Sequence, residues 1–538
     1  MEECTSGHPE CQQALPPLPT RVIDVGQTST DTPKLCWGAY RSGPYCALSH
    51  CWGVDRKPLQ TDDRTLLRRQ IGIPLGTLPK TFQDAITITR SLSVQYLWID
   101  SLCIIQDDAA DWDRESAQMA SIYENARLVI AASRASDSSR GCFSSRVLSK
   151  ISSRPFFVDQ KTEGRSVAFY LRPEKQRLHM YYHPESKYNV RRNYRLPLLT
   201  RGWALQERIL ATRAVHFTSE ELVWECCKHT VCECMALNPI TGRVQSKEMW
   251  KNAIQQSGHH RFELWHRITK LYMSLSITYQ SDCLPALSGL AKQMQANGAG
   301  EYAAGLWRAN IFGDLLWAPG MNGRRVRAKK WRAPSWSWAS LNNGIELFMG
   351  KITSVEKLGP GYGASIGANP EASGSRIRIH LNLPSTEKQF PLKHIATQYA
   401  TLENLHCPPS GQDATGQVAS TASITISAPV FSATVKVKTR DGYPDRHISK
   451  NGKQLPFECD CTGDSPSEGC SVLCMWVGNF LQKPAILVLV ESRGISGLPP
   501  TAGAYERLGI FSLFYLSKDI KTMIEWLVEA EIRTIKIV

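Results

Sequence analysis

The sequence predicts an α/β fold with a largely parallel sheet in the N-terminal half, and two observations support this fold class. First, residues 94–100 (VQYLWID) and 127–133 (RLVIAAS) are short, nearly continuous apolar runs, which are typical of strands buried on both faces. Second, residues 78–92 and 109–126 place apolar side chains at helical spacing. Strands that alternate with helices usually form a parallel sheet with helices on its faces.

Other segments complete the predicted organisation. An early strand is expected in RVIDV at 21–25, and another in YCALSHCWG at 45–53, where an apolar run ends in an aromatic–glycine turn. Beyond the sheet, residues 134–200 are expected to form loops and a few strands, and RAVHF and LVWEC around TSEE, residues 213–226, are expected to form a hairpin. Residues 245–317 are mostly helical, and the chain after 340 is β-rich with long Gly/Ser/Pro loops and a final helix near 520–531. We therefore divide the chain into an N-terminal leader, an α/β core domain, a helical region and a β-rich C-terminal region, at residues 1–43, 44–227, 228–340 and 341–538.

Charge and composition exclude several classes of protein. The 538 residues carry a net charge of +14, but the basic residues are scattered, and the longest basic cluster, residues 323–332, is short. We interpret them as a solvated surface and predict no nucleic-acid partner. The N-terminus lacks the apolar core of a secretory signal, and no apolar run reaches the roughly 18 residues of a membrane span. A cytoplasmic protein with no membrane span is expected.

The 17 cysteines are odd in number and often lie inside apolar segments, so they are predicted to be buried thiols rather than disulfides. The densest group lies in ECCKHTVCEC, residues 225–234. A zinc site usually has two pairs of ligands separated by a longer gap, and this group has no distant second pair. The motif at 459–474 is also irregular. The sequence therefore predicts no metal at either place. In the first motif the cysteines expected to bind no metal are Cys226, Cys227, Cys232 and Cys234.

The stretch YLWIDSLCIIQDDAADWDRE, residues 96–115, contains the first candidate site. Asp100 ends a buried strand, and ligands of open α/β sheets gather at the carboxyl ends of strands. Asp100 has the alternative role of capping the loop that follows. On the next helix Glu115 lies within the apolar stripe, where an unpaired carboxylate is costly and burial raises its pKa. Glu115 is either a functional carboxylate or the partner of an arginine.

A second candidate lies in TRGWALQERIL, residues 200–210. Trp203, Glu207 and Leu210 share one helix face, so Glu207 is a second carboxylate on an apolar stripe. Because Arg201 and Arg208 flank it, a salt-bridged joint between helix and sheet is the favoured interpretation. The remaining ligand or loop candidates lie near the strand ends and are Ser49, Trp52, Cys103 and Gln106.

Four motifs in order and spacing resemble the fungal heterokaryon incompatibility (HET) domain family. These motifs are YCALSHCWG, LPKTFQDAI, the long segment 96–133 and RGWALQERIL, and they cover about 45–227. The resemblance implies a fungal intracellular protein of non-self recognition, a regulated cell-death module that acts through protein partners and self-association and has no cofactor. Ile105 stands where the family often has Asn, and His50 where Tyr is common.

The HET fold is thought to be similar to the TIR domain, so the resemblance implies a flavodoxin/TIR-like parallel sheet. Some TIR domains hydrolyse NAD through a glutamate on a helix that follows a sheet strand, and Glu115 has a comparable place. A buried carboxylate stabilises the oxocarbenium-like state of glycosidic cleavage. The alternative function is therefore an NAD glycohydrolase with NAD as substrate and Glu115 as catalytic group.

Overall fold

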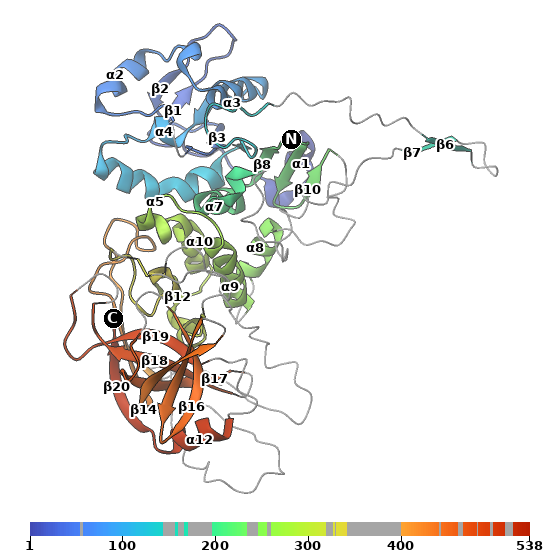
Figure 1. Ribbon diagram of the computed structural model, residues 1–538. Coiled ribbons are helices and arrows are strands. Elements are labelled where there is room, and N and C mark those ends of the chain that lie inside the picture. The colour runs from blue at the N-terminus through green and yellow to red at the C-terminus, as the bar shows by residue number, and fades with distance from the viewer. Residues whose placement is uncertain are drawn as a thin grey trace. The chain divides into compact units, whose positions relative to one another are not determined.

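The computed structural model describes most of the chain (Figure 1). The described residues are 1–53, 58–143, 156–159, 166–169, 196–233, 246–255, 260–318, 327–328, 330–341, 400–440, 443–460, 466–480, 483–494, 499–511 and 520–538. Cys234, half of the basic cluster 323–332 and the Gly-rich segment before residue 400 lie outside them. The chain forms two compact units, residues 1–252 and 253–538, and each is described by itself.

The first unit is built on an eight-stranded mixed sheet with the order β10-β9-β8-β5-β3-β4-β1-β2. The four central strands β4, β3, β5 and β8 are parallel, which confirms the parallel layer predicted for 45–133. Antiparallel pairs flank them on both sides, because short connections join β1 to β2 and β8 to β9. The strands are β1 Arg21–Asp24, β2 Lys34–Trp37, β3 Tyr45–Ser49, β4 Tyr96–Trp98, β5 Leu128–Ala131, β8 Arg213–Phe217, β9 Leu222–Cys226 and β10 Thr230–Cys232.

Helices connect the parallel strands, as a parallel crossover requires. Two helices lie between β3 and β4, and two between β4 and β5. The longest, α5, begins after Asp108, whose carboxylate accepts hydrogen bonds from the backbone N–H groups of Ala110 and Asp111. The helices of this unit are α1 Glu2–Gly7, α2 Asp63–Ile71, α3 Lys80–Ser91, α4 Asp100–Cys103, α5 Ala109–Asn125 and α7 Gly202–Leu210, and a 3-10 turn η1 covers Pro9–Cys11.

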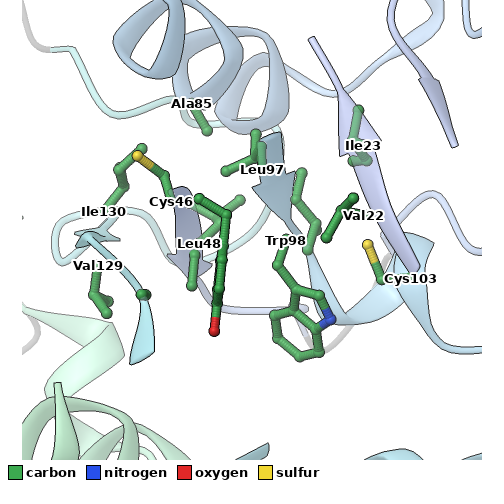
Figure 2. Close-up of a cluster of buried hydrophobic side chains, with 14 of the residues drawn as sticks. Val22, Ile23, Cys46, Leu48, Ala85, Leu97, Trp98, Cys103, Val129 and Ile130 are labelled. Carbon is green, nitrogen blue, oxygen red and sulfur yellow. The ribbon is translucent and has the colours of Figure 1, made fainter. Parts of the chain in front are cut away.

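The core of the first unit lies around the central strands (Figure 2). Leu97 and Ile99 are fully buried, as predicted, although Ile99 follows β4 rather than lying within it. Trp98 is also fully buried, and its ring meets the Tyr123 ring edge-on at 5.6 Å. Trp203 of α7, by contrast, is only half-buried and packs at the margin of this core.

The segment predicted to be helical contains helices in its described part, with α8 Ser246–Gln255 at the boundary of the two units. Within the second unit α9 and α10 pack their apolar faces inward, and Trp265 and Trp307 meet edge-on at 5.5 Å. The remaining elements here are α9 His260–Met273, α10 Pro285–Ala296, β11 Tyr302–Ala303, β12 Leu306–Trp307 and α11 Ile311–Asp314.

The C-terminal region is β-rich, as predicted, over the residues described from 400 onward. Its strands are almost all antiparallel, and β14 pairs with both β15 and β17, so that the sheet closes on itself. The helix predicted near 520–531 is α12. The elements are β13 Thr401–His406, β14 Ser423–Arg440, β15 Tyr443–Lys450, β16 Lys453–Cys459, β17 Ser471–Phe480, β18 Lys483–Glu491, β19 Tyr505–Phe511, α12 Ile520–Val528 and β20 Glu531–Ile537, and the separate hairpin β6 Phe156–Asp159 and β7 Ser166–Phe169 precedes them in the chain.

Across the described residues, no helix combines the length and the apolar character that crossing a bilayer requires.

Candidate functional site

The order of the parallel strands creates a preferred place for a site. In chain order β3 is the first of the four, β4 lies on one side of it, and β5 and β8 lie on the other. The chain therefore changes direction across the sheet at β3, and ligands of open α/β sheets bind outside the carboxyl ends of strands at such a point. Ser49 is the last residue of β3, and Asp100 follows shortly after β4.

Ser49 and Glu207 form a buried pair at this point. The Ser49 hydroxyl donates a hydrogen bond to the Glu207 carboxylate, which α7 brings to the end of β3. Burial raises the pKa of Glu207 to about 7, against the opposing effects of the Ser49 hydrogen bond and the Arg201 charge. Glu207 therefore changes charge near neutral pH. The sequence favoured a salt-bridged joint between helix and sheet at this position, and in the structure Glu207 contacts the sheet through Ser49.

A second group of candidates surrounds His50. The indole N–H of Trp52 donates to Asp100 Oδ2 over 2.7 Å, and Asp100 Oδ1 lies 3.7 Å from His50 Nδ1. The Arg201 guanidinium donates to the backbone carbonyl of His50. Burial lowers the pKa of His50 to about 4, although the Asp100 charge opposes this shift, so the imidazole is neutral at pH 7.

The structure thus brings five of the sequence-predicted residues together, namely Ser49, Trp52, Asp100, Arg201 and Glu207. Two more, Gln106 and Cys103, shape the loop after β4. The Gln106 amide donates to the carbonyls of Asp100 and Ile104 over 3.3 and 3.1 Å. The Cys103 side chain is fully buried, and burial raises the pKa of its thiol.

Glu115 lies in a separate cluster around Arg21 of β1. Arg21 donates to Asp111 and to the Cys103 carbonyl, and its Nη2 atom is 3.8 Å from Glu115 Oε1. Glu115 is 1% exposed, and burial raises its pKa against the effects of a Thr20 hydrogen bond and the Arg21 charge. Its Oε2 atom is buried without a hydrogen-bond partner among the described residues. An arginine partner was one of the two roles expected for Glu115, and its catalytic role stays a prediction.

A further buried network was missed from the sequence. Ser133 Oγ lies 3.0 Å from His216 Nδ1, and His216 Nε2 lies 3.0 Å from Glu225 Oε2. The Arg208 guanidinium donates to both oxygens of Glu225 over 2.7 and 2.5 Å. Although burial opposes it, the Arg208 charge holds the pKa of Glu225 well below its usual range. Burial lowers the pKa of His216, so a neutral imidazole bridges a hydroxyl and a carboxylate.

The sequence contained a signal for part of this network. The hairpin RAVHF–TSEE–LVWEC was predicted, and its register pairs Ala214 with Glu225 and His216 with Val223. His216 and Glu225 are therefore diagonal neighbours on one face, within reach of each other. Ser133 and Arg208 come from other elements, and only the folded chain brings them to this pair.

A small cavity separates the two networks. Ser49, Arg208 and His216 contribute to its wall, together with apolar side chains of β5 and α7, and it has room for about one water molecule. Pockets that bind drug-sized ligands have volumes of roughly 300–1,000 Å³. The polar side chains at the strand ends thus contact one another beside a small cavity, whereas both ring nitrogens of His50 lack a hydrogen-bond partner among the described residues.

These features define an α/β domain with a buried polar centre at the carboxyl ends of its parallel strands. Residues 45–207 match the family model of the heterokaryon incompatibility protein (HET), which confirms the resemblance seen in the motifs of this part of the chain. The match begins with the first residue of β3 and ends at Glu207, so His216 and Glu225 lie beyond it. No curated protein and no solved structure matches the chain.

Proposed function

We propose that the protein is a regulated cell-death signalling module of fungal non-self recognition that acts in the cytoplasm through protein contacts, including self-association. The HET domain over residues 45–207 carries this proposal. The burial of these polar groups supports the contact-based mode, because Ser49, Glu207 and His216 are each less than a tenth exposed and have partners within the protein. A switch of this kind works through a local change of charge or packing that biases an element with two states.

Inducible expression in fungal cells tests this proposal. We expect expression of the whole chain to cause cell death while the cellular NAD content, measured before membrane integrity is lost, stays at its level in uninduced cells. Two differently tagged copies should also co-purify if self-association is part of the mechanism. Surviving cells, or a fall in NAD that precedes death, would contradict a contact-driven module.

The alternative function is a TIR-like NAD glycohydrolase, and two observations favour keeping it. The parallel strands have the order second, first, third, fourth, which is the order of flavodoxin-like sheets. Buried carboxylates with raised pKa values, Glu115 and Glu207, lie near this sheet. A carboxylate in such surroundings can stabilise the positive charge that develops on the ribose as the nicotinamide bond breaks.

Incubation of the purified protein with NAD separates the two functions. An NAD glycohydrolase releases free nicotinamide, and Glu115→Gln should abolish the release because Gln keeps the volume but loses the negative charge. Asp113→Asn on the same helix is the matched control and should retain activity. Loss of activity only in Glu207→Gln would move the catalytic role to the carboxylate beside Ser49. Under the contact-driven proposal we expect no release from any of these proteins.

A further inference from the structure

A group of sulfur and nitrogen atoms lies at the end of β9, and its residues fall outside the segment that matches the family model. The helix α1 carries Cys4, His8 follows it, and Cys11 ends η1. The last residue of β9 is Cys226. The folded chain brings its side chain to the other three, although more than two hundred residues separate Cys226 from them. Their ligand atoms, three Sγ and one imidazole nitrogen, all lie within 4.8 Å of one another.

The distances from His8 are close to those between two ligands of one metal ion. His8 Nδ1 lies 3.9 Å from Cys11 Sγ and 3.6 Å from Cys226 Sγ. Ligands of a tetrahedral zinc ion, with Zn–S of about 2.3 Å and Zn–N of about 2.0–2.1 Å, lie about 3.5–3.8 Å from one another. We propose that Cys4, His8, Cys11 and Cys226 bind a structural zinc ion.

The surroundings fit thiolate ligands. The backbone N–H of His229 donates to Cys226 Sγ over 3.3 Å, and the N–H of Cys226 donates to the His229 carbonyl over 2.8 Å, so a tight turn holds this sulfur. Such hydrogen bonds to a ligating sulfur orient it and stabilise its negative charge. Three thiolates and one neutral histidine leave a net charge of about −1 on a zinc complex. The Arg213 guanidinium, which interacts with Cys4 and donates to the Cys11 carbonyl, supplies compensating positive charge.

Ordinary apolar packing explains the cluster poorly. The four buried residues of this small core are all cysteines, Cys4, Cys11, Cys226 and Cys227, with Trp224 packed against them. A cysteine side chain buries little apolar area, so four of them stabilise a terminal segment weakly. All four are free thiols. A zinc ion bound by all four ligands would fix the first eleven residues against β9.

The sequence predicted no metal here because ECCKHTVCEC lacks a distant second group of ligands. The structure provides that second group from the N-terminal segment, with three residues between Cys4 and His8 and two between His8 and Cys11. Such spacings are typical of zinc ligands. Among the described residues of the dense motif only Cys226 joins the set, whereas the neighbouring Cys227 directs its thiol to the Thr212 carbonyl over 3.5 Å.

Metal analysis of the full-length protein tests the proposal. The chain, purified without chelators, should contain about one zinc ion per molecule. Cys4→Ser and Cys226→Ser should lose it, and Cys227→Ser, the matched control beside Cys226, should retain it. Zinc-free wild-type protein would overturn the proposal, and so would unchanged zinc content in both ligand variants.

Cobalt substitution gives a second readout, and its first part uses only the wild-type protein. Wild-type protein reconstituted with Co²⁺ should show the intense visible bands of a tetrahedral site and the near-ultraviolet absorption of thiolate–cobalt bonds. His8→Ala, at the half-buried position of the set, should change these bands. A weak octahedral spectrum, or a wild-type spectrum in His8→Ala, would contradict the site. Since neither measurement uses cell death or NAD cleavage, the result is independent of the proposed function.

Discussion

Glu207 illustrates how one buried carboxylate makes stability depend on pH. Its pKa is about 7 in the folded chain, above the ordinary value of 4.5, so the folded state binds a proton more tightly than the unfolded state does. The free energy of unfolding therefore falls as the pH rises from about 4.5 to about 7. The lowered pKa of His50 acts in the opposite direction between about pH 4 and 6.5, so wild-type data alone do not separate the two.

We expect Glu207→Gln to remove the contribution of Glu207 while leaving that of His50. Chemical denaturation at several pH values should show that the variant gains stability relative to wild type between pH 4.5 and 7, by up to about 3 kcal/mol. Ser49→Ala is a useful companion, because it removes the hydrogen bond to the carboxylate but keeps the titrating group. A constant difference between Glu207→Gln and wild type across this pH range would contradict the assignment.

The two tryptophans of the first unit should differ in their contributions. Trp98 is fully buried, and truncating a large aromatic side chain in a core costs roughly 3–5 kcal/mol, so Trp98→Ala should lower the free energy of unfolding by this amount. Trp203 is half-buried, so Trp203→Ala should cost clearly less. Urea denaturation measures both variants. Equal losses would show that burial does not determine the contribution of these side chains.

At the scale of elements, helix α5 depends on its first turn. The Asp108 carboxylate accepts from two backbone N–H groups that have no partner within the helix, over 2.9 and 3.1 Å. Asp108→Ala should therefore cost about 1 kcal/mol, while Asp108→Asn should retain most of the stability. Gln118→Ala, at an exposed position in the same helix, is the control and should change stability little. Thermal or urea denaturation of the three variants checks this order.

Some helices and strands could be predicted from the sequence alone, and the pairings between them could not. The apolar runs at β4 and β5 and the helical spacing of α5 depend on local pattern, and each was predicted within a few residues. The pairing of β1 with β4 has no local signal, because Ile23 and Leu97 are far apart in the chain and only the folded sheet sets their register. For the same reason the sequence placed Glu115 on an apolar stripe but did not identify Arg21 as its partner.

The candidate site was predictable to a similar degree. Ser49, Asp100 and Glu207 were chosen because they lie at strand ends or on apolar helix faces, and the structure brings them together. Their partners depend on tertiary contacts, which pattern does not encode. The same holds for the dense cysteine motif, since the residues that face Cys226 lie at the other end of this unit's sequence.

At the scale of the whole molecule, the two compact units have separate cores. In the second unit, Arg507 of β19 is fully buried and donates to Asp460 and to the carbonyls of Leu315 and Trp317. This arginine joins the C-terminal sheet to the segment after α11. Removing one partner of a buried ion pair leaves an uncompensated charge, which costs about 3–5 kcal/mol.

Asp460→Ala and Trp98→Ala should therefore affect different unfolding transitions. Scanning calorimetry should show that Asp460→Ala lowers the melting temperature of the second unit and leaves that of the first unchanged, with the reverse for Trp98→Ala. Lys436→Ala, which removes an exposed ion pair with Glu468 in the second unit, is the control and should have little effect. A single transition lowered equally by both variants would mean that the units unfold together.

The closed C-terminal sheet has a consequence for how the protein is made in the cell. Strand β14 needs partners that are synthesised much later, since Ile424 pairs with Ile537, about 110 residues downstream. Until those partners leave the ribosome, an 18-residue strand rich in Val, Ile and Ala has unpaired edges, the kind of surface that associates with other nascent chains. Sheets assembled from such distant pairings also fold slowly. Production of this unit should therefore depend on chaperones that shield β14 during translation.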